Sequence, residues 1–298
     1  MSHYRTYSDF LKTYFSEKIQ KLTVNASLGC PNRDGTIGRG GCIYCDNRSF
    51  NPSYCRSGYS ISQQIEAGKQ FFAKKYPDMK YLAYFQAYTS THGDNNMLLT
   101  MYNEALADND VKGLIVGTRP DCIPDSLLDK FEQLRDRTGK HIFLEYGAES
   151  SHNQTLQIIN RCHTWECTVD TVNRTHKRGI PIGLHFIMGL PGETHDMMMD
   201  TIGQINTLPI DTVKFHQLQV ISGTPLHRMI NNNQIDLKPF SLEEYLDLCV
   251  EIVKRLDKRI AIERFTGQAP ANMLVAPKWG IKNHVFTDKL NQLLSNER

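Results

Sequence analysis

The 298-residue sequence lacks the features that mark membrane, secreted and low-complexity proteins. No apolar run approaches the roughly 20 residues that a membrane-spanning helix needs. The opening residues, 1–15, contain no hydrophobic segment of the kind found in signal peptides, and no linker or low-complexity stretch interrupts the chain. These absences exclude a membrane span and predict a cytoplasmic protein with no membrane partner.

A strong charge of one sign is also absent, which leaves only the distribution of charge to interpret. Hydrophobic residues make up 40% and charged residues 22% of the chain, and this composition excludes a disordered, collagen-like or coiled-coil protein. Residues 1–58 hold 8 basic and 4 acidic side chains and residues 250–298 hold 9 and 5, so each end carries +4 and the middle −6. Basic ends suit an anionic partner such as a nucleic acid, although a solvated surface more often explains such an excess.

Three of the eight cysteines form a group whose spacing suits metal or cluster binding. Cys30, Cys42 and Cys45 are separated by 11 and then 2 residues, and the first gap contains four glycines and a turn signal at Asp34. Three thiolates would leave one iron of a [4Fe–4S] cluster open to a substrate or cofactor, because such a cluster usually takes four. A zinc site, or an electron-transfer cluster with Cys55 as fourth ligand, is the alternative on spacing alone.

The remaining cysteines carry weaker signals. Cys249 lies in the apolar face of a helix that begins at the capping box Ser241-x-x-Glu244, so we expect it in the core. Cys162 and Cys167 are expected to be buried or half-buried thiols, and Cys122 follows the end of a strand.

Strand-like and helix-like segments alternate along the chain. Apolar runs predict strands at 21–28, 80–88, 113–118, 141–146, 181–188, 212–220 and 260–264. Caps and periodicity predict helices at 124–138, 166–178, from 194 onward, at 241–258 and at 288–294. The alternation predicts an α/β fold with a parallel sheet, closed into a partial (β/α)6 TIM-like barrel. We expect one domain over 1–298, with a core at about 20–265 and a C-terminal extension at about 266–298.

The predicted topology places the cysteine group where α/β proteins bind ligands. In parallel α/β folds the site forms at the carboxyl ends of the strands. Cys30 and the residues after it follow the first strand, and the segments 86–91, 118–119, 145–149, 185–189 and 216–219 follow or end later ones. This agreement favours a catalytic cluster.

The segment GCPNRDGTIGRGGCIYC resembles the cluster loop of radical S-adenosylmethionine (SAM) proteins. The likeness extends along most of the chain through FQAYT, GTRPD, LEYGAES, INRCHT, HFIMGLPGE, VKFHQLQV and ERFTGQAP with the later APKW. Together these motifs resemble the YhcC/YtqA-like radical SAM family, which is related to the radical SAM domain of the Elongator catalytic subunit. The resemblance implies that Cys30, Cys42 and Cys45 hold a [4Fe–4S] cluster, that SAM binds its open iron, and that reductive cleavage generates a 5′-deoxyadenosyl radical.

The resemblance also implies contacts to SAM. Tyr44 matches an aromatic position that would pack on adenine or shield the cluster. Gln86 stands near the place where many of these enzymes bind the SAM amine with Gly-Gly-Glu. Glu145 suits the ribose hydroxyls, with a buried ion pair as alternative, and Arg161 suits the SAM carboxylate, with a solvent-facing role as alternative. In the motif around Arg161, Cys162 replaces the usual glycine.

Further strand-end residues are expected in the pocket. Gly189 would bring backbone close to adenine, with a plain strand-to-helix turn as the alternative. Thr118, His185 and His216 would line the pocket, although a lone histidine is more often a satisfied core residue.

The resemblance indicates the substrate less directly than it indicates the chemistry. Relation to the Elongator domain and the basic ends favour a tRNA nucleobase, bound through the N-terminal Lys18, Lys21, Arg33, Arg39, Arg48 and Arg56 and the C-terminal Lys254, Arg255, Lys258, Arg259, Arg264, Lys278 and Lys282. A flavodoxin or ferredoxin would supply the electron. The alternatives are an Fe–S carrier or accessory protein without SAM turnover, and a radical SAM enzyme for a small metabolite. The oligomeric state leaves no signal in the sequence.

Overall fold

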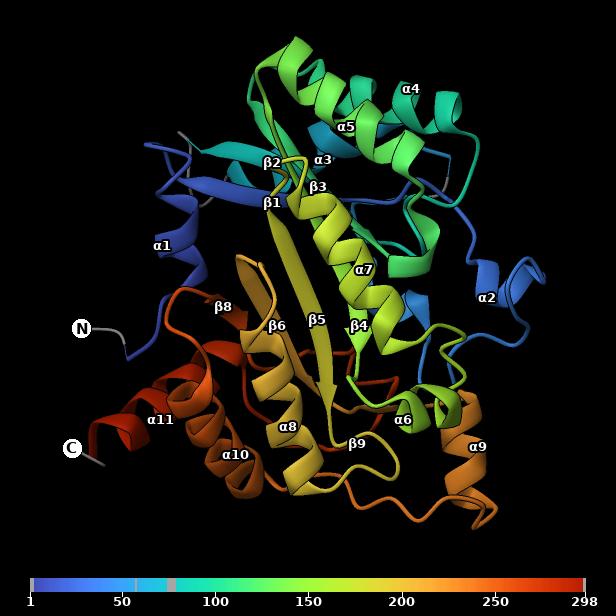
Figure 1. Ribbon diagram of the computed structural model, residues 1–298, viewed down its shortest axis with the longest axis vertical. Helices are drawn as coiled ribbons and strands as arrows, with labels where there is room; N and C mark the ends of the chain where they lie inside the picture. The colour runs from blue at the N-terminus through green and yellow to red at the C-terminus, as the bar shows by residue number, and fades with distance from the viewer. Residues whose placement is uncertain (1–2, 57, 74–78, 297–298) are drawn as a thin grey trace.

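Seven parallel strands form the centre of the protein. The computed structural model describes residues 3–56, 58–73 and 79–296. The strands lie in the order β1-β2-β3-β4-β5-β6-β8 and curl into a half-barrel (Figure 1). They are β1 (Ile19–Val24), β2 (Lys80–Phe85), β3 (Val111–Thr118), β4 (His141–Glu149), β5 (Ile182–Met188), β6 (Thr212–Gln217) and β8 (Ala261–Arg264). The predicted partial TIM-like barrel is confirmed.

Helices cover the outer face of the sheet, and most of them begin at side-chain caps. They are α3 (Ile61–Ala73), α4 (Asn95–Leu106), α5 (Asp125–Thr138), α7 (Trp165–His176), α8 (His195–Asn206) and α10 (Leu242–Arg255). The Ser241 side chain accepts from the Glu244 N–H and the Glu244 carboxylate accepts in return, which is the predicted capping box. Gly139 ends α5 with φ 63°, a left-handed conformation that favours glycine.

The N-terminal segment fills the inside of the half-barrel at the amino ends of the strands. Helix α1 (Tyr7–Leu11) and the residues after it bring Phe10 and Phe15 against inward-facing side chains of the sheet. These side chains are Leu82, Tyr84, Ile115, Phe143 and Ala261. The N-terminal segment therefore packs at the end of the barrel opposite the carboxyl ends of the strands.

Several strand bounds differ from the prediction: the strand expected at 80–88 ends at 85, and the one expected at 141–146 continues to 149. Strand β1 stops at Val24, not Leu28, because the side-chain amide of Gln64 takes over the pairing: its Oε1 accepts from the Asn25 N–H and its Nε2 donates to the Asn25 carbonyl, both at 2.9 Å. The segment expected as one strand at 212–220 is divided into β6 and β7 (Val220–Ile221), and β7 pairs antiparallel with β9 (Leu274–Ala276).

The last helices also differ in length from the prediction. Helix α10 stops at Arg255, not Lys258, because Leu256 is extended and the Asp257 N–H is bound by Asn206. Helix α11 (Asn283–Asn296) is longer than the predicted 288–294 and packs on α10 through Phe286 and Leu290.

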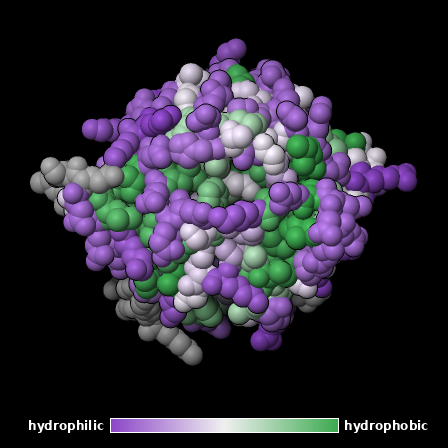
Figure 2. Space-filling view, turned by 90° about the horizontal axis from the view of Figure 1, so that it is seen from below, coloured by the Kyte–Doolittle hydropathy of each residue, from purple (hydrophilic) through white to green (hydrophobic). Residues whose placement is uncertain are grey.

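Short elements connect the barrel strands at the carboxyl end. They are α2 (Pro31–Asp34), η1 (Asn47–Phe50), η2 (Pro120–Cys122), α6 (Asn153–Ile158) and α9 (Pro225–Asn231). Seen from the end toward which β5 points, the surface is mainly hydrophilic and its hydrophobic residues gather in separate patches (Figure 2). In the described residues no helix combines the length and apolarity needed to cross a membrane.

Candidate functional site

A pocket of about 210 Å³ lies at the carboxyl ends of the barrel strands, where the sequence predicted it. Ten of the eleven residues singled out from the sequence line it. They are Cys30, Cys42, Tyr44, Cys45, Gln86, Thr118, Glu145, Arg161, His185 and His216. They come from the loop after β1 and from β3, β4, β5, β6 and the connections that follow β2 and β4. The fold therefore brings together residues that span most of the sequence.

Gly189 is the exception, and its expected approach to adenine stays a prediction. It is absent from the described residues that line the pocket. Its φ is 83°, and a Cβ at this position would lie 2.7 Å from the ring of Phe240. A left-handed turn packed against an aromatic ring accounts for this glycine, which is the strand-to-helix turn that the sequence left as the alternative.

The cysteine loop, residues 30–45, is held by its own backbone and by two side chains. Cys30 precedes the short helix α2, and Gly35 ends this helix with φ 94°. Asn32 is fully buried and directs its side-chain N–H at the Cys42 sulfur, at 3.7 Å. Arg33 donates to the Cys45 carbonyl at 2.8 Å. The loop thus arrives at the pocket with its thiols already turned inward.

Cys55 takes no part in this site. Its thiol is buried and donates to the Thr23 carbonyl at 3.1 Å, and it does not line the pocket. Burial raises the pKa of Cys55 to about 11, so it stays a neutral thiol. The structure therefore gives no support to Cys55 as a fourth ligand. Cys249 is fully buried in the core, as predicted.

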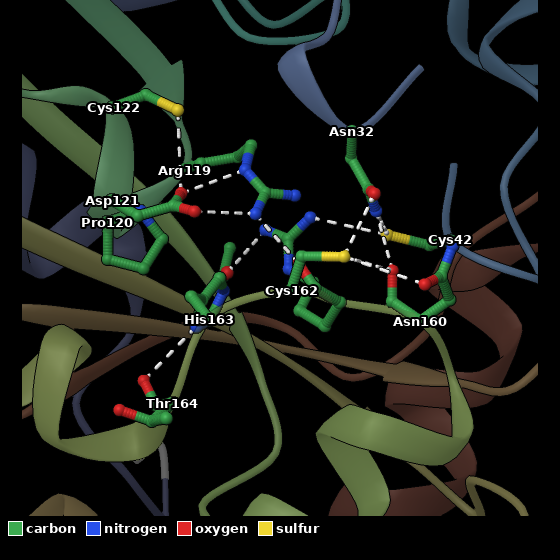
Figure 3. A network of polar contacts seen from close by, with 12 residues as sticks. Asn32, Cys42, Arg119, Pro120, Asp121, Cys122, Asn160, Cys162, His163 and Thr164 are labelled. Atoms are coloured by element: carbon green, nitrogen blue, oxygen red, sulfur yellow. Dashed lines mark hydrogen bonds and ion pairs between the residues drawn. The ribbon is translucent and has the colours of Figure 1, made fainter. Parts of the chain in front are cut away.

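Cys162 corrects the expectation of a buried or half-buried thiol, because it is exposed. Its φ is 64°, so the chain keeps the left-handed turn for which a glycine would be suited. The thiol donates to Asn32 Oδ1 at 3.1 Å and lies beside Asn160 and the network around Cys42 (Figure 3). The replacement of glycine by cysteine leaves the local turn intact.

Arg161 is anchored beside the cysteine loop. It is 6% exposed, which contradicts the solvent-facing alternative. Its Nη1 donates to the Cys42 sulfur at 3.5 Å, its Nη2 to the Gly147 carbonyl at 2.6 Å, and Glu149 lies 3.4 Å away. Its Nε is buried without a partner among the described residues. One N–H of this guanidinium is therefore left for a ligand.

A second guanidinium supports the first. Arg119 forms a paired contact with the carboxylate of Asp121 at 2.8 and 2.7 Å, and its Nη2 also donates to the Arg161 carbonyl at 2.7 Å (Figure 3). It is 2% exposed and lines the pocket. Its Nη1 is a further buried donor that has no partner in the part of the chain that the structure describes.

Glu145 lies in the buried ion-pair arrangement that the sequence left as its alternative role. Its carboxylate is bound by Lys214 at 2.5 Å, by Lys21 at 3.2 Å and by His185 at 2.9 Å. Burial opposes the charged form, but the two lysines outweigh it and hold the pKa of Glu145 well below its usual range. A contact from this carboxylate to a ribose would have to replace or share one of these partners.

Sequence reasoning missed the rest of this group, which we call the charged wall: Lys21, Glu145, Lys214, Glu263 and Arg264. Lys21 bonds to Glu263 across the barrel, and Lys214 lies 3.2 Å from Glu263 and donates to the Tyr84 hydroxyl at 2.9 Å. Burial, together with Lys21 and Arg264, lowers the pKa of Lys214 to about 8 against the opposing pull of the two glutamates. A signal was available, because charged residues interrupt apolar strands in KLTV, VKF and IER.

The buried position of Lys21 also corrects its assignment to an RNA-binding surface. Its side chain is 17% exposed and is committed to two carboxylates inside the barrel. Of the basic residues expected to face RNA, Arg33 and Arg264 line the pocket and Arg48 is exposed. The basic ends are thus divided between the interior and the surface.

The donor set fits an iron–sulfur cluster. All three thiols are free and border one pocket, and two N–H groups point at the sulfur of Cys42. Thiolate ligands with hydrogen bonds to sulfur are typical of such clusters. Among the described residues no group of three or more His, Cys, Asp or Glu side chains is placed to hold a single metal ion.

Comparison with known proteins agrees with the motifs. The family model described as the radical SAM superfamily matches residues 24–205, and one described as a radical SAM C-terminal domain matches 210–296. YtqA of Bacillus subtilis is 32% identical over 98% of this chain and 90% of its own, and YhcC of Escherichia coli K12 is 34% identical over 89% and 84%.

More distant similarities cover larger proteins. A tRNA uridine(34) acetyltransferase of Methanocaldococcus infernus is 26% identical over 54% of this chain, which corresponds to 30% of its own length. The solved structure of Methanocaldococcus infernus Elp3 superposes with a TM-score of 0.73 at 17% identity, over 94% of this chain and 63% of that one. The latter likeness shows a shared fold.

Proposed function

The chain belongs to the radical SAM superfamily, within it to the family of YtqA and YhcC, and we propose that it is an enzyme that cleaves SAM reductively. Cys30, Cys42 and Cys45 would hold the [4Fe–4S] cluster. The observation that carries this proposal is that three free thiols line one pocket at the carboxyl ends of the strands, whereas Cys55 does not line it. Such a cluster with one open iron supplies the electron that splits SAM into methionine and a 5′-deoxyadenosyl radical.

The residues of the chain would prepare this site in two ways. Asn32 and Arg161 donate hydrogen bonds toward the Cys42 sulfur and would so support it as a ligand of the cluster. Arg161 would offer its remaining Nε–H to the carboxylate of SAM, because a guanidinium pairs well with a carboxylate. Tyr44, Gln86 and Thr118 line the same space and would contact the rest of the cofactor while excluding water.

We also propose that the substrate is a nucleobase of tRNA. The support is the similarity to a protein named tRNA uridine(34) acetyltransferase, the position of Arg33 at the pocket, where it bonds to the Cys45 carbonyl, and the exposure of Arg48 shortly after Cys45 in the chain. A base would have to leave its stack to enter the pocket, and loop nucleotides do so at the lowest cost. A protein of the flavodoxin or ferredoxin class would supply the electron.

The test is anaerobic reconstitution with iron and sulfide, reduction with dithionite and incubation with SAM. We expect 5′-deoxyadenosine and methionine in equal amounts, measured by liquid chromatography and mass spectrometry. Two variants serve as controls. Cys42→Ala should form neither product, and Cys55→Ala should form both. A wild-type protein that binds the cluster but releases no 5′-deoxyadenosine would favour an electron carrier and contradict the proposal.

The substrate is tested separately by comparing the modified nucleosides of total tRNA from cells with and without the gene. A nucleoside that is lost without the gene and restored by the wild type, but not by the Cys42→Ala variant, would support the tRNA proposal. Unchanged nucleosides together with active SAM cleavage would favour a small metabolite.

A further inference from the structure

Two sequence motifs to which the proposed chemistry gives no role form one side of the pocket. VKFHQLQV supplies β6 and the residues after it, and ERFTGQAP supplies β8 and the loop that follows. Gln217 accepts from the Gly267 N–H at 3.0 Å and donates to its carbonyl at 3.1 Å, and Gln219 donates to the same carbonyl at 3.1 Å. The two segments are therefore locked together, which fixes the side chains that project from them.

Arg264 projects from this side with an unused hydrogen-bond donor. It lines the pocket, and its Nη2 donates to Nε2 of His216 at 3.3 Å. Its Nε is buried and has no partner among the described residues. A buried N–H without an acceptor costs about 1–3 kcal/mol in general, so a persistent one indicates a ligand that supplies the acceptor.

His216 completes the donor set. A guanidinium can only donate, so Nε2 of His216 must be the acceptor and the ring proton lies on Nδ1. Burial, reinforced by Arg264, His185 and Lys214, holds the pKa of His216 well below its usual range, so the ring is neutral at pH 7. A Cβ on Gly267 would lie 3.0 Å from this Nδ1, so the glycine keeps the space beside the donor open.

The charge of the surroundings points to the same kind of ligand. Lys21, Lys214 and Arg264 are the cations of the charged wall, and Glu145 and Glu263 are its anions. Burial lowers the pKa of His185 as well, so neither histidine adds charge at neutral pH. Three cations face two anions in a buried space, and an uncompensated buried charge is costly. A ligand with one negative charge would restore the balance.

We propose that Arg264 and His216 form a subsite for an anionic group of the substrate, a carboxylate or a phosphate. This inference rests on the proposed function, since it assigns the chemistry of the substrate in the pocket shared with SAM. Arg161 and Arg119 have separate acidic partners, Glu149 and Asp121, so the charge imbalance is a property of the charged wall.

The test measures the binding of two anionic probes, acetate and inorganic phosphate, to the reconstituted protein in the presence of SAM. Each probe is titrated at constant ionic strength against sodium chloride, and the midpoint of thermal unfolding gives an apparent dissociation constant. We expect saturable stabilisation by at least one probe in the wild type, and binding at least tenfold weaker in Arg264→Gln. The matched control is Arg137→Gln on α5, where an exposed arginine bonds to Asn103, and it should bind as the wild type does.

A second variant and the comparison of the two probes test the inference further. If Arg264→Gln does not fold, Arg264→Lys retains the charge but loses the forked donor and should still bind at least threefold more weakly than the wild type. Tighter binding of acetate would identify a carboxylate as the substrate group, and tighter binding of phosphate a phosphate. No saturable stabilisation by either probe, or equal binding by wild type and Arg264→Gln, would overturn the subsite. Because 5′-deoxyadenosine is measured in the same samples, a failure of SAM cleavage is recognised independently.

Discussion

The two ends of the pocket are built by different means. The cysteine loop is a short stretch whose ligands lie within sixteen positions of one another and whose shape depends on local turns at Gly35 and on Asn32 and Arg33. The charged wall joins side chains from β1, β4, β6 and β8 through buried ion pairs. The comparison teaches that the geometry of the cysteine loop depends on neighbouring residues in the sequence. The charged wall forms only when the strands of the sheet are in place, and its ion pairs in turn help to hold those strands together.

The largest effect should appear when the cysteine side chains of the loop are replaced, one at a time. We expect Cys30→Ala, Cys42→Ala and Cys45→Ala each to lose the cluster, and Cys55→Ala to retain about four irons per chain, because only the first three thiols line the pocket. Iron and sulfide analysis with visible absorption after anaerobic reconstitution measures this. Loss of the cluster in Cys55→Ala alone would show that the protein uses a fourth thiolate.

The free energy of unfolding should depend more strongly on an ion pair of the charged wall than on an ion pair at the surface. Glu145→Gln removes one of the two buried carboxylates that Lys21 and Lys214 share, and should lower the free energy of unfolding by about 3–5 kcal/mol. The matched control is Glu132→Gln, which removes an ion pair with Arg135 at 3.6 Å on the surface. This variant should change the free energy of unfolding by less than about 0.5 kcal/mol. Urea unfolding followed by circular dichroism measures both. Equal effects would mean that the wall contributes no more than a surface pair.

The charged wall should also make stability depend on acid. The folded state holds the pKa of Glu145 well below 4.5 through Lys21 and Lys214, so between that folded pKa and 4.5 the unfolded chain binds more protons. The stabilisation is therefore complete above about pH 4.5 and is lost as the pH falls through the folded pKa. Unfolding free energies from pH 6 down to pH 3 should fall less steeply in Glu145→Gln than in the wild type, and identical slopes would contradict this assignment.

The two ends were also unequally predictable from the sequence. Cys30, Cys42 and Cys45 are close in sequence, so their spacing alone indicated a metal or cluster site, and the strand pattern placed them at the carboxyl end of the barrel. Lys214 and Glu263 are 49 positions apart, and nothing local shows that they meet. The orientation of Gly189 toward Phe240 depends on a long-range contact of the same kind. Local spacing was sufficient for the loop, whereas the wall required the tertiary pairing of strands.

A smaller effect should connect Arg161 to the cluster. Its Nη1–H points at the Cys42 sulfur, and a hydrogen bond to a ligand sulfur stabilises the more negative reduced state. Arg161→Gln should therefore lower the reduction potential, by about 40 mV for each kcal/mol of stabilisation lost, given 59 mV per tenfold change for one electron. A redox titration monitored by electron paramagnetic resonance measures it, with iron content as the check that the cluster is present. An unchanged potential would show that the contact is structural only.

The smallest effect should come from a single exposed charge at the rim of the cysteine loop. Arg48 lies in η1, shortly after Cys45, and its side chain is 79% exposed, whereas Lys21 is enclosed in the charged wall. If tRNA crosses this rim, Arg48→Gln should reduce the slope of log affinity against log salt by about 1, because one phosphate contact releases about one counterion. The matched control is Lys177→Gln. Lys177 is exposed at the C-terminal end of α7, and this end of the helix leads to the amino end of β5, away from the pocket. Filter binding of tRNA at several salt concentrations, with SAM present, gives both slopes, and equal slopes in the two variants would place the RNA elsewhere on the molecule.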